Sequence, residues 1–196
     1  MSVNDPLPWI ADECALIRDA VAKSVPVIGH CLGGQLISQA LGGRVSPNTG
    51  KEIGWGNTRV ATGAGGQADK EIARLWLGDW LDETAGLADV FQWHGETFSL
   101  PPGAQRLFTN DFCTNQAFVL GPHLAMQCHV EMTPEMIAAW CKSWPAEVQG
   151  VAPLPASVQT PQQMLAEATG RLPAMRRLAD QLYSVWIGGL KDRRSG

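Results

Sequence analysis

A buried-strand signal that runs directly into a glycine-flanked cysteine constrains the fold of this chain most. The run from Val25 to Gly29 is short, apolar and β-branched, which is typical of a buried strand in a parallel sheet. Residues 32–41 then have the pattern of a helix, and Gly42-Gly43 is a good signal for its end. The chain therefore turns sharply from a buried strand into a helix at a single cysteine.

That cysteine, Cys31, lies in a G-x-C-x-G pattern formed by Gly29-His30-Cys31-Leu32-Gly33. The pattern is that of a nucleophile elbow with cysteine in place of serine. The positive end of the helix dipole favours the thiolate form of a cysteine at a helix N-terminus. The backbone N–H of Leu32 is placed to donate to a developing oxyanion. From the pentapeptide alone, a buried structural cysteine beside a glycine-rich turn remains an alternative.

A thiolate mechanism also needs a base and a group that orients the base, and His129-Val130-Glu131 offers both. Residues two apart in an extended strand point to the same side, so imidazole and carboxylate can lie side by side. Isolated H-x-E pairs are common at protein surfaces. Together with the cysteine elbow, however, His129 and Glu131 are candidate catalytic residues.

Composition bounds the remaining classes of function. The chain has 196 residues, of which 45% are hydrophobic and 17% charged, so we expect one ordered domain over residues 1–196. The net charge of −4 argues against a nucleic acid or an anionic membrane as partner, and no apolar run is long enough to span a bilayer. Five cysteines, with no C-x-x-C pair and no signal peptide, favour free thiols in the cytoplasm.

Periodicity and turn residues predict the other elements. Apolar spacing predicts helices over residues 8–23 and 71–81, and a last helix whose apolar stripe includes Met175, Leu178, Leu182 and Val185. Thr133-Pro134 and Thr160-Pro161-Gln162-Gln163 are typical helix starts. Short strands are expected at residues 90–93, 106–109, 116–120 and 124–129. Turns are expected at residues 94–97, and residues 62–66 are expected to form a surface loop rather than a phosphate cradle.

Four motifs together resemble one known family. They are Gly-His-Cys-Leu-Gly-Gly-Gln-Leu at 29–36, Glu-Ile-Gly-Trp at 52–55, Trp-His-Gly-Glu-Thr-Phe at 93–98 and Gln-Cys-His-Val-Glu at 127–131. In order and spacing they resemble class I (triad-type) glutamine amidotransferase domains, closest to the stand-alone group described as GMP-synthase-like. The resemblance extends from about residue 3 to the C-terminus.

The resemblance implies a fold and a reaction. The fold would be a three-layer α/β, flavodoxin-like amidotransferase fold with a mostly parallel central sheet between helices. Cys31 would attack the γ-amide carbon of glutamine, His129 would move the proton, and water would hydrolyse the γ-glutamyl thioester. No cofactor is implied.

The resemblance also assigns substrate contacts. Gln35 matches the position that holds the amino-acid end of the substrate, and His94 and Gly95 match a second substrate-contacting loop. The segment Glu52–Trp55 is interpreted mainly as packing. Any domain that activates an ammonia acceptor would be a separate synthetase chain, because no P-loop is present.

Two other functions use the same residues. Another γ-glutamyl amide, of a polyamine or a peptide, would need the same three catalytic groups and a different pocket. A catalytically inactive scaffold would work through binding alone. A metal site among His94, His123, Cys128 and His129 is not expected, because neighbouring strand residues such as Cys128 and His129 point to opposite faces. We expect His123 to be exposed in a hairpin turn.

The N-terminus departs from the family pattern. Members normally carry about 45 further residues before a segment like Met1–Asp5, and these residues supply two strands and a Gly-Gly loop facing the nucleophile. We therefore expect the sheet to lack two strands and the oxyanion hole to lack its second donor. A start codon placed too late and a true truncation both account for this.

Overall fold

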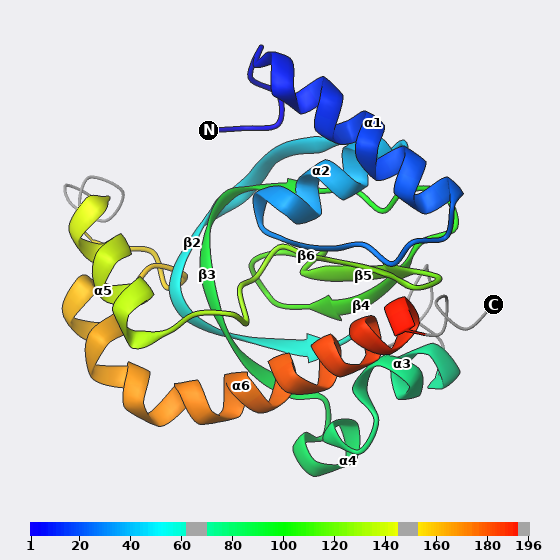
Figure 1. Ribbon diagram of the computed structural model, residues 1–196. Helices are drawn as coiled ribbons and strands as arrows, with labels where there is room; N and C mark the ends of the chain where they lie inside the picture. Colours follow the sequence, from blue (N-terminus) through cyan, green and yellow to red (C-terminus); the bar gives the residue numbers. More distant parts are fainter. Residues whose placement is uncertain (62–69, 145–152, 192–196) are drawn as a thin grey trace.

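The computed structural model describes residues 1–61, 70–144 and 153–191, so the loop expected at 62–66 lies outside the described residues (Figure 1). One sheet has the strand order β1-β6-β5-β4-β2-β3. The strands are β1 (Ile28–His30), β2 (Val45–Val60), β3 (Leu87–Phe98), β4 (Gln105–Thr109), β5 (Ala117–Leu120) and β6 (His123–Met126). The helices are α1 (Pro8–Ala22), α2 (Leu32–Ala40), α3 (Lys70–Leu77), α4 (Trp80–Thr84), α5 (Pro134–Ser143) and α6 (Pro161–Lys191).

The sheet lies between two layers of helices, as expected for an α/β fold (Figure 1). Side chains of successive residues in β5 and β6 face opposite layers. Phe118 and Ala125 pack in the core beneath α1 and α2. Val119 and Leu124 pack in the larger core that α3, α4, α5 and α6 cover. Each face of the sheet therefore has its own hydrophobic core.

The expectation of a mostly parallel sheet is wrong for the described strands. Only β1 and β6 pair in parallel, with Ile28 opposite Leu124, and each of the other pairs of neighbouring strands is antiparallel. A short turn at Gly121, which has a φ of 56°, joins β5 to β6. A connection this short permits only antiparallel pairing, because a parallel pair needs a crossover of a dozen or more residues.

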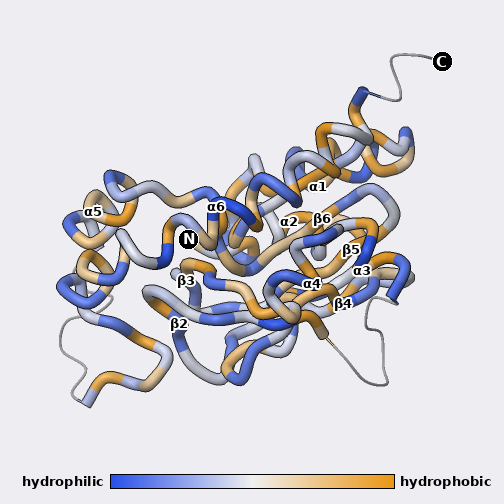
Figure 2. The backbone as a smooth tube through the Cα atoms, turned by 90° about the horizontal axis from the view of Figure 1, so that it is seen from below, coloured by the Kyte–Doolittle hydropathy of each residue, from blue (hydrophilic) through white to orange (hydrophobic). Residues whose placement is uncertain are grey.

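The helix starts predicted from the sequence are confirmed. Thr133 caps α5 by accepting a hydrogen bond from the N–H of Met136 at 3.2 Å. Thr160 and Gln163 form a reciprocal capping box at the start of α6, with bonds of 2.8 and 3.3 Å. Hydrophilic and hydrophobic segments alternate along α1 and α6 in Figure 2, in keeping with one buried and one exposed side. Within the described ranges, no helix is long and apolar enough to cross a membrane.

The long antiparallel pair of β2 and β3 differs from the expectation of turns at residues 94–97. The two strands pair from Val45 opposite Phe98 to Arg59 opposite Leu87. His94 and Gly95 therefore lie inside a strand instead of a turn, with His94 opposite Glu52. The reason is that β2 pairs with β3 on both sides of a register shift between Pro47 and Glu52, which a local turn signal does not reveal.

Candidate active site

Cys31 lies at a strained turn between the end of β1 and the start of α2. Its φ and ψ are 46° and −108°, an unfavourable conformation for a residue with a side chain. The Cys31 N–H donates to the carbonyl oxygen of Met126 on β6 at 2.8 Å, which fixes the turn against the sheet. Leu32 is the first residue of α2, so its N–H lies at the positive end of that helix beside the thiol.

Two glycines, Gly29 and Gly34, make this tight turn possible. The G-x-C-x-G spacing predicts Gly29 and Gly33, so it is right for the first and wrong for the second. A Cβ on Gly29 would lie 2.5 Å from the carbonyl carbon of Gly33. A Cβ on Gly34 would collide with the carbonyl oxygen of Met126. A Cβ on Gly33 would meet nothing within 4 Å. The backbone of Gly33 is what crowds Gly29, whereas Gly34 lets α2 approach β6.

His129 and Glu131 form a close pair beside the elbow. Glu131 Oε1 lies 2.5 Å from His129 Nδ1, and Glu131 Oε2 accepts from the backbone N–H of Val130 at 2.9 Å. The strand expected over 124–129 ends at Met126. His129 is held by an isolated bridge to Phe91 of β3, through two backbone hydrogen bonds of 2.8 and 3.0 Å.

The pair has strongly shifted ionisation. Burial alone would lower the pKa of His129, but the Cys31 thiol and the Glu131 carboxylate more than offset it and raise that pKa to about 9. Burial opposes ionisation of Glu131 too, yet His129, His30 and the backbone lower its pKa to about 2. His129 Nε2 is buried and makes no hydrogen bond of standard geometry to a described residue. This nitrogen, on the side of the ring away from Glu131, therefore keeps an unused hydrogen-bonding capacity.

His30 lies beside Glu131 and Tyr183 lies beside His30, and neither role was predicted from the sequence. His30 Nδ1 lies 3.4 Å from Glu131 Oε2, and His30 Nε2 lies 2.9 Å from the Tyr183 hydroxyl of α6. Burial is the main reason that the pKa of His30 is lowered. His30 is the variable residue of the elbow pattern, which is the one signal that could have drawn attention to it. Tyr183, the single tyrosine of the chain, is 153 residues away.

Gln35 lies one turn into α2 and is buried at the same site. Its Nε2 donates to Gln127 Oε1 at 3.2 Å, and Gln127 Nε2 approaches the Cys31 sulfur at 3.7 Å. The sulfur also lies 3.7 Å from the Trp93 carbonyl oxygen, the acceptor for the thiol proton. Gln127 belongs to the fourth sequence motif but had no assigned role there.

A cavity of about 420 Å³ opens onto Cys31. Its polar lining includes three residues expected from the sequence to contact substrate and two charged residues that the sequence did not single out: Gln35, His94, Gly95, Lys51 and Glu96. Trp93 and Trp144 supply an aromatic part of the lining. Leu32 completes the group of predicted site residues at this cavity, which therefore offers both charged and aromatic surfaces to a ligand.

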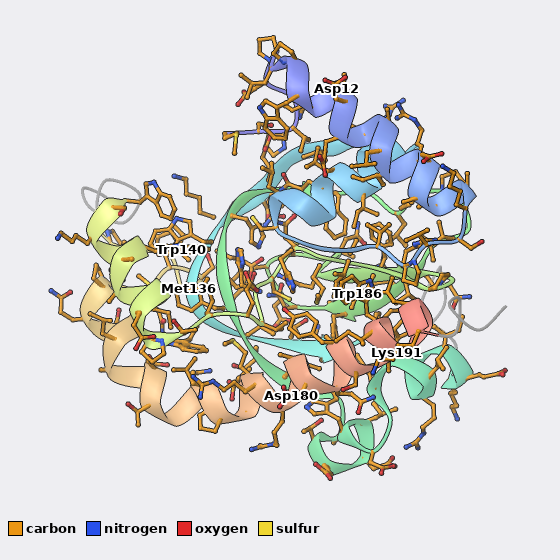
Figure 3. All side chains as sticks on the ribbon, in the orientation of Figure 1. Asp12, Met136, Trp140, Asp180, Trp186 and Lys191 are labelled. Carbon is orange, nitrogen blue, oxygen red and sulfur yellow. The ribbon has the colours of Figure 1, made fainter. Side chains whose placement is uncertain are left out.

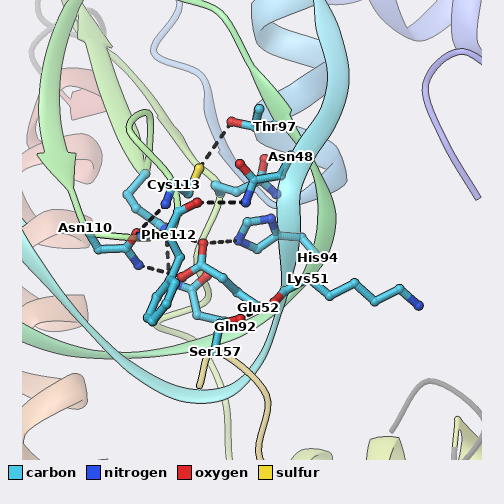
Figure 4. Close-up of polar contacts among 12 residues, drawn as sticks. Asn48, Lys51, Glu52, Gln92, His94, Thr97, Asn110, Phe112, Cys113 and Ser157 are labelled. Carbon is cyan, nitrogen blue, oxygen red and sulfur yellow. Dashed lines mark hydrogen bonds and ion pairs between the residues drawn. The ribbon is translucent and has the colours of Figure 1, made fainter. Parts of the chain in front are cut away.

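Glu52 does more than pack, contrary to the interpretation from sequence. Its buried carboxylate accepts hydrogen bonds from Asn110 at 2.6 Å and Gln116 at 2.9 Å, and lies 3.1 Å from His94 Nε2 (Figure 4). His94 Nδ1 lies 2.9 Å from the carbonyl oxygen of Glu96. The imidazole thus lies between the Glu52 carboxylate and the Glu96 carbonyl, on a strand segment that lines the cavity.

Of the four histidines, His94 lines the cavity, whereas His30, His123 and His129 do not, and Cys128 does not line it either. His123, which was expected to be exposed, is buried. Its Nδ1 accepts a hydrogen bond from the N–H of Val27 at 3.2 Å, where β1 pairs with β6. Cys128 is fully buried in the larger core.

Comparison with known proteins shows to which family the chain is similar. The family model for glutamine amidotransferase class-I matches residues 3–138. The GMP synthase [glutamine-hydrolyzing] of Aromatoleum aromaticum is 33% identical over 135 residues, covering 67% of this chain and 24% of that protein. Gamma-glutamyl peptidase 3 of Arabidopsis thaliana is 27% identical over 131 residues, covering 66% of this chain and 50% of that protein.

A solved structure extends the likeness to the fold. The crystal structure of a glutamine amidotransferase from Methylobacillus flagellatus matches with a TM-score of 0.85 and 41% identity, covering 97% of this chain and 73% of that chain. The chain spans only 24% of the length of the GMP synthase and 50% of the length of the gamma-glutamyl peptidase named above. The elbow, the mixed α/β sheet and these matches together show that the chain belongs to the class I glutamine amidotransferase family.

Proposed function

We propose that this chain hydrolyses the γ-amide of glutamine through Cys31, His129 and Glu131 and releases ammonia. The position of Cys31 supports this most strongly, because a strained cysteine at a helix N-terminus opens onto a cavity next to a His–Glu pair. Glu131 orients His129 and stabilises its protonated form. The family to which the chain belongs contains relatives described as glutamine-hydrolyzing.

The reaction has two halves. The Cys31 sulfur attacks the γ-carbonyl carbon, and the oxyanion of the tetrahedral intermediate accepts from the Leu32 N–H. His129 then gives a proton to the amide nitrogen, the C–N bond breaks, and ammonia leaves a γ-glutamyl thioester on Cys31. Water attacks the thioester with His129 as base, which yields glutamate and restores the thiol.

The cavity supplies groups for the amino-acid end of glutamine. Gln35 can bond both a carboxylate and an ammonium group, because an amide has donors and an acceptor. His94 and Gly95 lie on β3, and Glu52 lies 3.1 Å from His94 Nε2. Glu96 and Lys51 place opposite charges at the same cavity, as a zwitterionic substrate requires. We further propose that a separate synthetase chain receives the ammonia, since the relative named GMP synthase is about four times longer than the match.

Ammonia release from glutamine by the 196-residue chain tests this function. We expect activity that falls at least about 10³-fold in Cys31→Ala and in His129→Ala, and that Cys141→Ala keeps, because Cys141 is buried away from the cavity. Activity that survives Cys31→Ala would show that the mechanism is wrong. A folded chain without glutamine hydrolysis or hydrolysis of other γ-glutamyl amides would favour the inactive scaffold instead.

A second candidate function is hydrolysis of γ-glutamyl amides other than glutamine. The aromatic surface beside Cys31, formed in part by Trp93 and Trp144, favours it, because ammonia has no apolar group to place there. The likeness to a gamma-glutamyl peptidase agrees with this alternative. Rates on glutamine and on N-substituted γ-glutamyl amides, measured side by side, distinguish the two.

A further inference from the structure

Three tryptophans form a continuous aromatic cluster that begins at His129. The ring of Trp140 meets the His129 ring edge-on, with centroids 5.0 Å apart. Trp140 in turn packs against Trp144 at 5.4 Å and against Trp93 at 5.7 Å, and Trp93 lies 5.8 Å from Trp144. Figure 3 places Trp140 between α5 and the curved strands β2 and β3. We call Trp93, Trp140 and Trp144 the aromatic shelf.

The shelf is partly open to the cavity. Trp144 at the end of α5 is 45% exposed and, with Trp93, lines the same cavity as Cys31. Trp140 is half-buried behind them and connects them to His129. A large exposed indole beside a reactive cysteine offers apolar area to a bound ligand, since aromatic side chains carry much of the binding energy at such sites.

The chemistry decides which part of a substrate faces the shelf. The leaving nitrogen must lie next to His129, because His129 gives it the proton that completes C–N bond cleavage. The γ-glutamyl part is assigned to the polar residues Gln35, Gly95 and Glu96 of the cavity. A substituent on the leaving nitrogen therefore starts beside His129, where the shelf begins.

We propose that the aromatic shelf is a binding subsite for the amine side of γ-glutamyl amides with apolar, and especially aromatic, N-substituents. This inference rests on the proposed cysteine mechanism. The Cys31 sulfur forms a bond to the γ-carbonyl carbon, the C–N bond breaks, and the amine leaves with a proton from His129. Water then hydrolyses the thioester to glutamate, so no further reactant is needed.

The test compares γ-glutamyl anilide with glutamine in the 196-residue chain and two variants. Trp144→Ala is expected to lower kcat/KM for the anilide about 10-fold more than it lowers kcat/KM for glutamine. Trp144→Phe is expected to keep most of the anilide activity. Trp9→Ala is the matched control, because Trp9 is similarly exposed, at 40%, but lies on α1 in the opposite helix layer.

The type of substituent is tested with two aliphatic amides that share a four-carbon chain, one of which also carries a terminal ammonium group. γ-Glutamyl butylamide is expected to lose more kcat/KM in Trp144→Ala than γ-glutamyl aminobutylamide does, because an apolar subsite does not favour an ammonium group. The reverse order would show a cation-binding surface and overturn the proposal. An equal loss for anilide and glutamine, or no loss for either, would also overturn it, as expected if Trp144 instead contacts a partner protein.

Binding without turnover separates this inference from the proposed function. In a Cys31→Ala background, calorimetry is expected to give a lower Kd for the anilide than for glutamine, and adding Trp144→Ala is expected to remove the difference. That result without hydrolysis by the unaltered chain would overturn the mechanism and support the subsite. Hydrolysis of both amides with equal Kd values would support the mechanism and overturn the subsite.

Discussion

The imidazole rings of His30 and His129 lie nearly parallel, with centroids 6.4 Å apart and planes inclined by 15°. Both rings turn Nδ1 toward Glu131, His129 at 2.5 Å from one oxygen and His30 at 3.4 Å from the other. The two histidines differ in ionisation, since the pKa of His129 is raised and that of His30 is lowered. One carboxylate therefore stabilises a charged imidazole and positions a second one.

Replacing His30 is expected to disturb Glu131 without removing a reacting group. In His30→Phe the ring stays but the nitrogen near Glu131 is lost, so the pKa of Glu131 should rise and kcat should fall about 3- to 10-fold. As the pH is lowered, kcat should begin to fall at a higher pH in the variant than in the unaltered chain. Tyr183→Phe, which removes only the hydroxyl at 2.9 Å from His30, is the milder control. An unchanged profile in both variants would mean that His30 only packs.

The charge of His129 should depend on Glu131 in a way that NMR titration can measure. The His129 signal is expected to titrate near pH 9 in the unaltered chain and well below that in Glu131→Gln, where burial persists without the carboxylate. Activity should decline above about pH 9, because the proton for the leaving amine is lost. His123, whose pKa burial lowers, serves as the control and should not move in the variant. Identical His129 titrations in both proteins would contradict this account.

The free energy of unfolding should depend on pH through the ionisation of His129 and Glu131. The raised pKa of His129 contributes stability fully below its unfolded value of 6.5, and the contribution is lost as pH rises through about 9. The depressed pKa of Glu131 contributes above its unfolded value of 4.5, and that is lost as pH falls through about 2. Urea unfolding should therefore show the largest deficit of Glu131→Gln between pH 4.5 and 6.5, and a smaller deficit at pH 10.

The two neighbouring glycines of α2 should respond oppositely to alanine. Gly34→Ala places a methyl group on the Met126 carbonyl, which is backbone and cannot move aside, so we expect a loss of about 1–3 kcal/mol in unfolding free energy. Gly33→Ala meets open space on a helix and should be neutral or up to about 1 kcal/mol more stable. Urea unfolding of both variants checks this, and similar losses in both would be inconsistent with the elbow geometry.

The buried carboxylate of Glu52 should affect substrate binding more than turnover. Glu52→Gln puts an amide nitrogen next to the donor of Asn110 or Gln116 and weakens the hold on His94, so KM should rise about 10-fold with kcat within about 3-fold. Steady-state kinetics on glutamine measures the split. Glu167→Gln, a half-buried glutamate paired with Arg171 on α6, is the control and should leave KM unchanged. A fall in kcat alone would assign Glu52 a different role.

Thiol labelling at pH 7 should single out Cys31. The other four cysteines are buried, and burial raises the pKa of each thiol, that of Cys113 to about 11. An alkylating reagent is expected to modify one residue rapidly in the folded chain, and peptide mapping should identify it as Cys31. His129→Ala should slow this modification, because the group proposed to accept the thiol proton is removed. Equal labelling of several cysteines would count against an activated nucleophile.

The features that depend on residues close together in the chain could be predicted from the sequence. The elbow at Cys31 follows from a buried strand, a helix and the glycines around them. The helix starts at Thr133 and Thr160 follow from side chains that bond backbone groups three residues away. The contact between His129 and Glu131 is likewise local, although a bridge to β3, and not a strand, holds it.

The groups that surround these local features come from distant parts of the chain, and tertiary packing sets their positions. The short turn at Gly121 made β5 and β6 antiparallel, and the pairing of β2 with β3 put Glu52 opposite His94. Packing of α6 brought Tyr183 to His30, and packing of α5 brought Trp140 to His129. No periodicity encodes such contacts, because they depend on strand order and on how helices pack across a sheet. The proposed nucleophile and its proposed base are therefore readable from the chain, whereas the aromatic shelf that we propose as a subsite exists only in the folded molecule.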